Sequence, residues 1–358
     1  MNLYYSKMYM SDLDYVIEHT EDVLDGFRNK SVLIIGARGL VCSAIADILF
    51  RYNEKKDANT HLFLAGRSIE ALKERFSKYS KSKDCDFISF DSNISGDLIG
   101  KLPDDISYII DGIGPSAPGD IKAYPVDSLC NNVLLLKDLL TYADSRHSLG
   151  MLYISSSEIY GTSKKGGPFK EDDYEYVDIL NPRSSYSSGK RACENLCACF
   201  AGAVRTIIAR PGHVYGPTAR MDDDHIAASF AYEAAMGHDL KMNTEGLQLR
   251  SYCYMLDCAS AMLTILIRGK SGDAYNISNP ESVLTLRNMM DYIARAGNVS
   301  LTVGNTDGHI HDHKMDNPMP DSSLVSDKLI KLGWKGLFNA CDGADHTIRI
   351  IKQSMILP

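Results

Sequence analysis

Two short stretches of the chain hold the side chains with the clearest chemical potential. In "SSSEIYG" the hydroxyl of Ser156 and the carboxylate of Glu158 lie close together along the chain. In "YSSGK" the phenol of Tyr186 precedes the ammonium of Lys190 by one helical turn, so both lie on one helix face. A cation beside a phenol, with an oxidised nicotinamide above it, lowers the pKa of the phenol, so Tyr186 could take the proton of an alcohol that loses a hydride. We expect Ser156 to hydrogen-bond the same alcohol oxygen.

The hydride needs an acceptor, and the sequence contains a pattern that binds one. The run "SVLIIGARGLVCSAIADILF" is typical of a strand, a glycine turn and an amphipathic helix. Free amides at the start of such a helix face a pyrophosphate. The residues expected to bind the dinucleotide are Gly36, Arg38, Gly39, Leu40 and Val41, together with Tyr186 and Lys190. The third small position of the turn is Cys42 rather than Gly, which predicts looser packing of helix on strand.

The adenosine end of this pattern lacks the acidic residue that would bind the ribose hydroxyls. At that strand end stands Arg67, and Arg38 lies in the glycine turn. The two arginines could hold a 2′-phosphate, which makes NADP possible beside NAD; two surface arginines are the alternative. Asp91 ends the third strand and is either a partner of the adenine amino group or a simple turn residue.

Further β-rich runs, such as "HLFLAG", "ISYIID" and "GMLYISSS", alternate with helical patterns. This rhythm predicts an α/β fold, a Rossmann-type doubly wound parallel sheet with a smaller C-terminal substrate-binding lobe. We expect a helical extension over 1–30, a dinucleotide-binding domain over 31–212 that returns near 250–280, and mainly substrate-binding lobe over 213–358.

Composition narrows the class of protein. The 358 residues are 44% hydrophobic and 23% charged, with a formal net charge of -8, which argues against a nucleic-acid partner. We expect no membrane span and no signal peptide, and nine scattered cysteines suit the cytoplasm. We expect no metal: Cys193, Cys197 and Cys199 are interpreted as small hydrophobic residues. The histidines of "DGHIHDHKMD", namely His309, His311 and His313, are interpreted as a solvated loop.

Eight segments together carry a resemblance to a known family. They are "IIGARGLVCSA", "GPSAP", "SSSEIYG", "YSSGKRACE", "ARPGHVYGP", "QLRSYCYMLD", "AYNISNPESV" and "LIKLGW". In order and separation they resemble the extended short-chain dehydrogenase/reductases, the NAD-dependent epimerase/dehydratase family, and within it most nearly the UDP-glucuronate decarboxylases. The resemblance implies a tightly bound, recycled nicotinamide cofactor, a nucleotide-sugar substrate, and a homodimer formed through the Tyr186 helix and its predecessor.

The resemblance also assigns roles to individual positions. It makes Tyr186 the acid/base, Lys190 its activator, and Ser156 and Glu158 the other catalytic residues. The substrate-binding residues that it implies are Ser116, Ser157, His213 and Arg250, with Arg250 on the diphosphate. Four positions depart from the family pattern: Asp111 and His213 stand in place of His and Asn, and His225 and Pro320 in place of Arg. These changes make an unusual nucleotide sugar a possible substrate.

The residues favour one of three related reactions, all of which begin with oxidation at C4. A 4,6-dehydratase needs an acid beside Glu158 to protonate the leaving hydroxyl, and Ser157 is a poor acid. Epimerisation at C4 would give the Glu158 carboxylate no role in the reaction. Decarboxylation of a 4-keto uronic acid needs no such acid, so a decarboxylase is the expected function. A 4-epimerase, a 4,6-dehydratase, a reductase that consumes NADPH and a non-catalytic NAD(P)-binding regulatory protein are the alternatives.

Overall fold

A seven-stranded parallel sheet forms the centre of the protein. The computed structural model describes residues 2–114, 119, 123–304 and 319–355. The strand order is β10-β6-β5-β4-β1-β2-β3, and every neighbouring pair is parallel. The strands are β1 (Ser31–Ile35), β2 (His61–Gly66), β3 (Cys85–Ser89), β4 (Tyr108–Asp111), β5 (Gly150–Ile154), β6 (Thr206–Pro211) and β10 (Ala274–Ile277). The expected Rossmann-type doubly wound sheet is confirmed, and its order reverses at β1, where such folds bind ligands.

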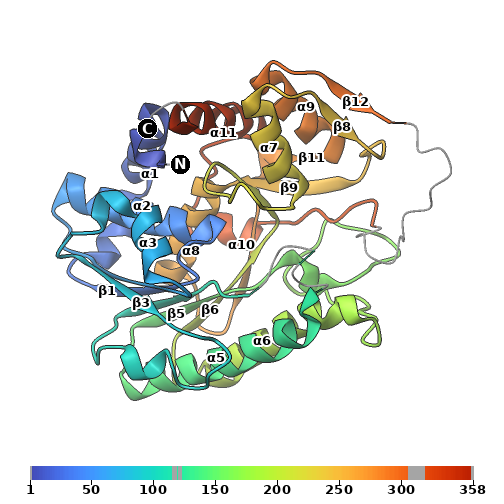
Figure 1. Ribbon diagram of the computed structural model, residues 1–358. Coiled ribbons are helices and arrows are strands. Elements are labelled where there is room, and N and C mark those ends of the chain that lie inside the picture. The colour runs from blue at the N-terminus through green and yellow to red at the C-terminus, as the bar shows by residue number, and fades with distance from the viewer. Residues whose placement is uncertain (1, 115–118, 120–122, 305–318, 356–358) are drawn as a thin grey trace.

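Helices bury both faces of this sheet (Figure 1). One face carries α2 (Leu40–Lys56) and α8 (Met255–Arg268), with α3 (Ile69–Arg75) beside them, and the other carries α5 (Pro125–Ser145) and α6 (Ser185–Phe200). Side chains of β1 alternate between two cores: Val32 and Ile34 pack on the α2 side, Leu33 and Ile35 on the α5 side. Burial on both faces explains why β1 is a continuous apolar run.

The N-terminal helix α1 (Lys7–Leu24) packs against α2, α8 and the last helix, α11 (Ala340–Met355) (Figure 1). A fully buried carboxylate, Asp47 of α2, fixes this arrangement. It accepts hydrogen bonds from the hydroxyls of Tyr4, at 2.5 Å, and Tyr9, and it pairs with Arg75 Nη2 at 2.5 Å. The extension is therefore tied to the dinucleotide half by hydrogen bonds to a buried carboxylate as well as by packing.

The chain leaves the main sheet after β6 to build a second lobe, and α8 and β10 return to the sheet (Figure 1). The lobe has a three-stranded sheet, β11-β9-β7, and a two-stranded sheet, β12-β8. Its elements are β7 (His213–Tyr215), α7 (Ile226–Met236), β8 (Leu240–Met242), β9 (Leu249–Tyr254), β11 (Val283–Thr285), α9 (Leu286–Gly297) and β12 (Leu301–Val303). Helix α10 (Asp327–Ile330) packs against β10 of the main sheet. None of the described helices combines the length and apolar content that a membrane span requires.

Candidate active site

The glycine turn between β1 and α2 has the geometry that a dinucleotide requires. Gly36 has φ +71°, and a Cβ there would lie 2.9 Å from the carbonyl oxygen of Gly112, so only glycine fits. The amides of Gly36 and Ala37 donate to Ala65 O at 3.0 and 3.2 Å, which holds the turn against β2. Gly39 precedes α2 without a side-chain cap, and Leu40 and Val41 begin the helix. The first amides of α2 are thus left for an anion such as a pyrophosphate.

Cys42 fits closely at the third small position, contrary to the looser packing expected from the sequence. Its Sγ lies 3.6 Å from Ile35 O, and a Cβ built on Gly112 would be only 2.2 Å from that sulfur. Gly112, at the end of β4, therefore provides the space that a glycine at position 42 would have left.

Two exposed cations stand at the place where the sequence predicts the adenosine end of the cofactor. Arg38 and Arg67 are both exposed, and neither guanidinium makes a hydrogen bond or ion pair with the described part of the chain. Asp91 is held in a turn instead: its Oδ1 accepts from the backbone amide and Nδ2 of Asn93, both at 2.9 Å. The turn interpretation of Asp91 accounts for these contacts without a ligand.

Helix α6 presents Tyr186 and Lys190 on one buried face. Lys190 Nζ donates to Ile154 O at 2.7 Å and lies 5.8 Å from the centroid of the Tyr186 ring. Burial lowers the pKa of the Lys190 ammonium, and the nearby carboxylate of Asp111 opposes that effect. The last carbonyl of β5 thus fixes the ammonium beneath the phenol.

The phenol of Tyr186 is almost fully enclosed, with 7% of the residue exposed. Burial is the largest cause that raises its pKa, and the Glu158 carboxylate adds to it. A hydrogen bond with Ser156 and the charge of Arg183 act in the opposite direction. In the protein alone the pKa of Tyr186 is therefore raised, so Lys190 by itself does not bring it toward neutrality.

Ser156 and Glu158 meet Tyr186 from the end of β5, where the short helix η5 (Ser157–Tyr160) begins. Ser156 Oγ accepts from the amide of Glu158 at 3.2 Å, which fixes the spacing of the two side chains. Glu158 Oε1 accepts from Arg183 Nη2 at 2.8 Å. The structure therefore brings Ser156, Glu158, Tyr186 and Lys190 together and adds Arg183, which the sequence analysis missed. Its only signal was a basic residue one turn before Tyr186 in "NPRSSY".

Two other side chains of the "YSSGKRACE" segment hold the cluster in place. Glu194 accepts a 2.5 Å hydrogen bond from Ser155 Oγ and a bidentate pair from buried Arg210, at 3.0 and 2.6 Å. Arg191 Nε donates to Ile159 O at 2.6 Å. Both contacts join α6 to the β5 end, so they position the strand that carries Ser156 and Glu158.

Asp111, which departs from the family pattern, ends β4 in a fully buried position. Its Oδ1 accepts from the amide of Ile113 at 3.1 Å, and its Oδ2 has no partner within the described ranges. Burial raises the pKa of Asp111 to about 6, with Ile113 and Lys190 opposing. This carboxylate is the negative charge that faces Lys190 from β4.

Two of the four predicted substrate residues, His213 and Arg250, lie in the second lobe. Arg250 is buried in β9, and its Nη1 donates to Leu249 O and Met319 O at 2.8 and 3.0 Å. It is therefore built into the lobe framework, as is Pro320, whose carbonyl accepts from Leu249 N at 2.7 Å. Ser157 is half-buried in η5. Ser116 lies outside the described residues.

Two histidines stand where the resemblance expects Asn and Arg. His213 is exposed, yet desolvation, followed by the charges of Arg250 and His225, lowers its pKa to about 4. The ring is therefore neutral at pH 7. The hydrogen bond from His225 Nδ1 to Asp223 Oδ1, at 2.6 Å, raises the pKa of His225.

Asp223, Asp224 and His225 also place one potential ligand atom each within 4.8 Å of one another. Loop contacts use these atoms: Asp223 Oδ1 accepts from His225, and Asp224 Oδ2 accepts from Gly119 N at 3.0 Å. The three histidines His309, His311 and His313 lie outside the described residues.

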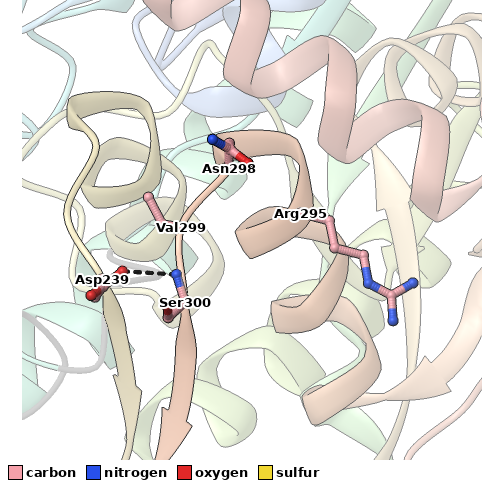
Figure 2. A pocket seen from close by; sticks show the side chains of 5 residues that line it. All are labelled: Asp239, Arg295, Asn298, Val299 and Ser300. Carbon is pink, nitrogen blue, oxygen red and sulfur yellow. Dashed lines mark hydrogen bonds between the residues drawn. The ribbon is translucent and has the colours of Figure 1, made fainter.

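A surface hollow in the second lobe, lined by Asp239, Arg295, Asn298, Val299 and Ser300, contains none of the predicted site residues (Figure 2).

Comparisons with known proteins identify the family of the chain. UDP-glucuronic acid decarboxylase 1 of Xenopus tropicalis is 22% identical over 333 residues, which cover 91% of this chain and 73% of that protein. A dTDP-glucose 4,6-dehydratase of Bacillus anthracis, solved with NAD, superposes with a TM-score of 0.74 at 16% identity, covering 91% of this chain and 98% of its own.

The UDP-glucuronic acid 4-epimerase of Bacillus cereus, solved with UDP-glucuronic acid and NAD, superposes with a TM-score of 0.73 at 18% identity. It covers 90% of this chain and 99% of its own. The model of one family, described as the NAD dependent epimerase/dehydratase family, matches residues 32–278. This protein is therefore an enzyme that belongs to the NAD-dependent epimerase/dehydratase family.

Proposed function

We propose that the protein is a nucleotide-sugar decarboxylase of the UDP-glucuronic acid type. The observation that carries the proposal is the pair of side chains at the start of η5, Ser157 and Glu158. Glu158 is present and paired with Arg183, while its neighbour is the hydroxyl of Ser157 rather than a carboxylic acid. Loss of water from C6 needs a proton donor there, whereas loss of CO₂ does not. Similarity to decarboxylases over most of the chain supports the same choice.

The residues present allow a balanced sequence of steps. Tyr186, as the phenolate, takes the proton of the C4 hydroxyl, and Ser156 holds the same oxygen. A nicotinamide cofactor held at the glycine turn of Gly36 and Gly39 would supply the acceptor for the hydride of C4 and the donor that returns it. Once C4 is a ketone, the C5–C6 bond breaks, CO₂ leaves, and the bonding electrons pass into an enolate whose oxygen faces Tyr186 and Ser156. A proton from water then adds at C5, and Tyr186 gives its proton back to the C4 oxygen as the hydride returns to C4.

Mass spectrometry of the reaction products tests this assignment. The NAD-loaded protein is incubated with UDP-glucuronic acid, UDP-glucose and dTDP-glucose. The expected result is loss of CO₂ from the uronic acid alone. Loss of water from either glucose, or an unchanged mass with conversion to a C4 epimer, would replace the decarboxylase by a dehydratase or an epimerase. No turnover with any of a wider panel would favour a non-catalytic NAD(P)-binding protein.

The cofactor site also bears on the choice of dinucleotide. NAD is the cofactor named for the family and bound in its solved relatives. Arg38 and Arg67 add two positive charges with no partner among the described residues, at the end where NAD and NADP differ. We infer that this site accepts NADP as well as NAD.

The α5–α6 face supports a homodimer. Val126 and Leu134 of α5 are 69% and 55% exposed, and Ala192 and Cys199 of the adjacent α6 are exposed too. An apolar face of this kind fits a second copy of the chain. Light scattering should give twice the chain mass, and the variant Leu134→Glu should give a monomer. A monomeric wild type would overturn the assignment.

All nine cysteines are free thiols, which supports a reducing cytoplasm as the compartment.

A further inference from the structure

Arg183 lies in the candidate catalytic cluster, but it has no role in the proposed reaction steps. It lies in the short helix η6 (Pro182–Ser184), and the side chain of Asn181 caps that helix by accepting from Arg183 N at 3.0 Å. Its guanidinium carbon lies 6.0 Å from the centroid of the Tyr186 ring, and 19% of its side chain is exposed. Arg183 therefore reaches the reaction centre from a fixed backbone position.

Most of the hydrogen-bonding capacity of this guanidinium is unused. Nη2 donates to Glu158 Oε1 at 2.8 Å, while Nε and Nη1 make no hydrogen bond within the ranges that the structure describes. A guanidinium carries five N–H donors in a planar fork that suits a carboxylate. N–H donors that are largely withdrawn from water and have no acceptor cost free energy. A ligand with acceptor oxygens would form these hydrogen bonds and bind more tightly because of them.

The stereochemistry of the proposed substrate brings such oxygens close to Arg183. Tyr186 and Ser156 fix the oxygen on C4 of the sugar. C6 is two bonds from C4, about 2.5 Å away, so its substituent lies beside the same phenol. Glu158 faces this place with a negative charge, which would repel a carboxylate unless Arg183 neutralised it.

We propose that Arg183 is the residue that selects a charged C6 group: its free N–H donors bind the carboxylate of a nucleotide-linked uronic acid and offset its repulsion by Glu158. The inference rests on the proposed function and deepens it. It makes the preference for a uronic acid over a neutral hexose a property of one side chain, and it gives Glu158 and Arg183 opposite effects on that preference.

Calorimetric binding to the NAD-loaded, full-length protein tests the proposal. UDP-glucuronic acid and UDP-glucose share every group except the one at C6. The variant Arg183→Gln should weaken binding of the uronic acid by about 10- to 100-fold, as expected for a lost charge-assisted hydrogen bond, and change binding of UDP-glucose less than about threefold. Arg183→Lys, which keeps the charge but not the fork, should retain part of the preference.

A double variant separates charge recognition from a merely structural role. Adding Glu158→Gln to Arg183→Gln removes the repulsion and should recover part of the lost affinity for the uronic acid. Equal weakening of both ligands, or no recovery in the double variant, would overturn the proposal. If Arg183→Gln fails to fold, Arg183→Lys decides: an unchanged ratio of the two affinities also overturns it. A protein that releases no CO₂ but loses uronic-acid preference in Arg183→Gln would refute the decarboxylase and leave this inference standing.

Discussion

The candidate catalytic cluster around Tyr186 and the second lobe differ in how far their candidate side chains are buried. Lys190 and Tyr186 are buried, and a hydrogen bond to Ile154 O, the Glu194–Arg210 pair and Arg191 fix the elements around them. In the lobe, exposed histidines occupy two positions where the family resemblance expects Asn and Arg. The chemical step needs fixed geometry, whereas recognition of a nucleotide sugar can be redistributed among exposed groups.

The largest effect should come from the buried cluster. Replacement of Tyr186 by Phe removes the proton acceptor and should lower the rate of hydride transfer by about 10²- to 10⁴-fold, with little loss of stability. The measurement is the rise in absorbance of reduced nicotinamide after the nucleotide sugar is added. Tyr79→Phe is the matched control, because Tyr79 is also buried, in a stack with Phe50 at 4.1 Å between centroids. Full hydride transfer in Tyr186→Phe would refute the assigned acid/base.

The second prediction concerns Asp111, where stability and function should move in opposite directions. Burial raises the pKa of this carboxyl from 3.8 to about 6, so its ionised form destabilises the fold. This cost is absent below the unfolded pKa, grows as the pH rises toward 6, and is complete above it. A shift of about two units corresponds to about 3 kcal/mol, so Asp111→Asn should be more stable than the wild type at pH 8 by up to that amount and gain little at pH 4.

The same substitution should impair the reaction. Asp111 supports the positive charge of Lys190, whose pKa burial already lowers. Without Asp111 the ammonium should lose its proton at a lower pH, so the alkaline limb of the pH–rate profile should move to lower pH and activity should fall more at alkaline than at acidic pH. Denaturant titrations and pH–rate profiles check both parts. A variant that is less stable at pH 8, with an unshifted alkaline limb, would contradict them.

Much of the buried cluster could be predicted from the sequence because its signals are local. Tyr186 and Lys190 share a helix face by spacing alone, and a strand, a glycine turn and a helix follow one another in the first β/α unit. The compensation of Cys42 by Gly112 could not be predicted in this way, because the two residues meet only when β4 lies beside β1.

Contacts between distant segments account for the rest of what the sequence analysis missed. Arg183 meets Glu158 only because the loop before α6 folds back over η5. Arg250, which the resemblance assigns to the diphosphate, also donates to the carbonyls of Leu249 and Met319, and the contact with Met319 joins segments far apart in the sequence. Side-chain type predicts what a residue can do, but the tertiary packing determines which partner it meets.

The third prediction addresses the cofactor end, where the expected effect is intermediate. If Arg38 and Arg67 hold a 2′-phosphate, each Ala variant should weaken NADP binding by about tenfold and change NAD binding less than about twofold. Fluorescence titration with NADPH and NADH measures both. Lys73→Ala is the control, because it removes an exposed charge from the neighbouring helix α3. Equal losses of affinity for NADPH and NADH would show that the two arginines do not bind the 2′-phosphate.

The smallest effect on substrate binding should come from the second lobe. There His225, whose charge depends on pH, stands in place of the arginine of the family pattern, which is always charged. The hydrogen bond to Asp223 raises the pKa of His225, so the ring keeps its proton to a higher pH than a free histidine and loses it as the pH rises through that pKa. If His225 faces the nucleotide, substrate affinity should fall a few-fold from pH 6.5 to 8.5. His225→Arg should flatten this dependence, because arginine stays charged over the whole range. His213 should add none, because its pKa of about 4 leaves it neutral throughout. A profile that is equally steep in His225→Arg would place the titrating group elsewhere, and the lobe would then recognise the nucleotide without the charge at position 225.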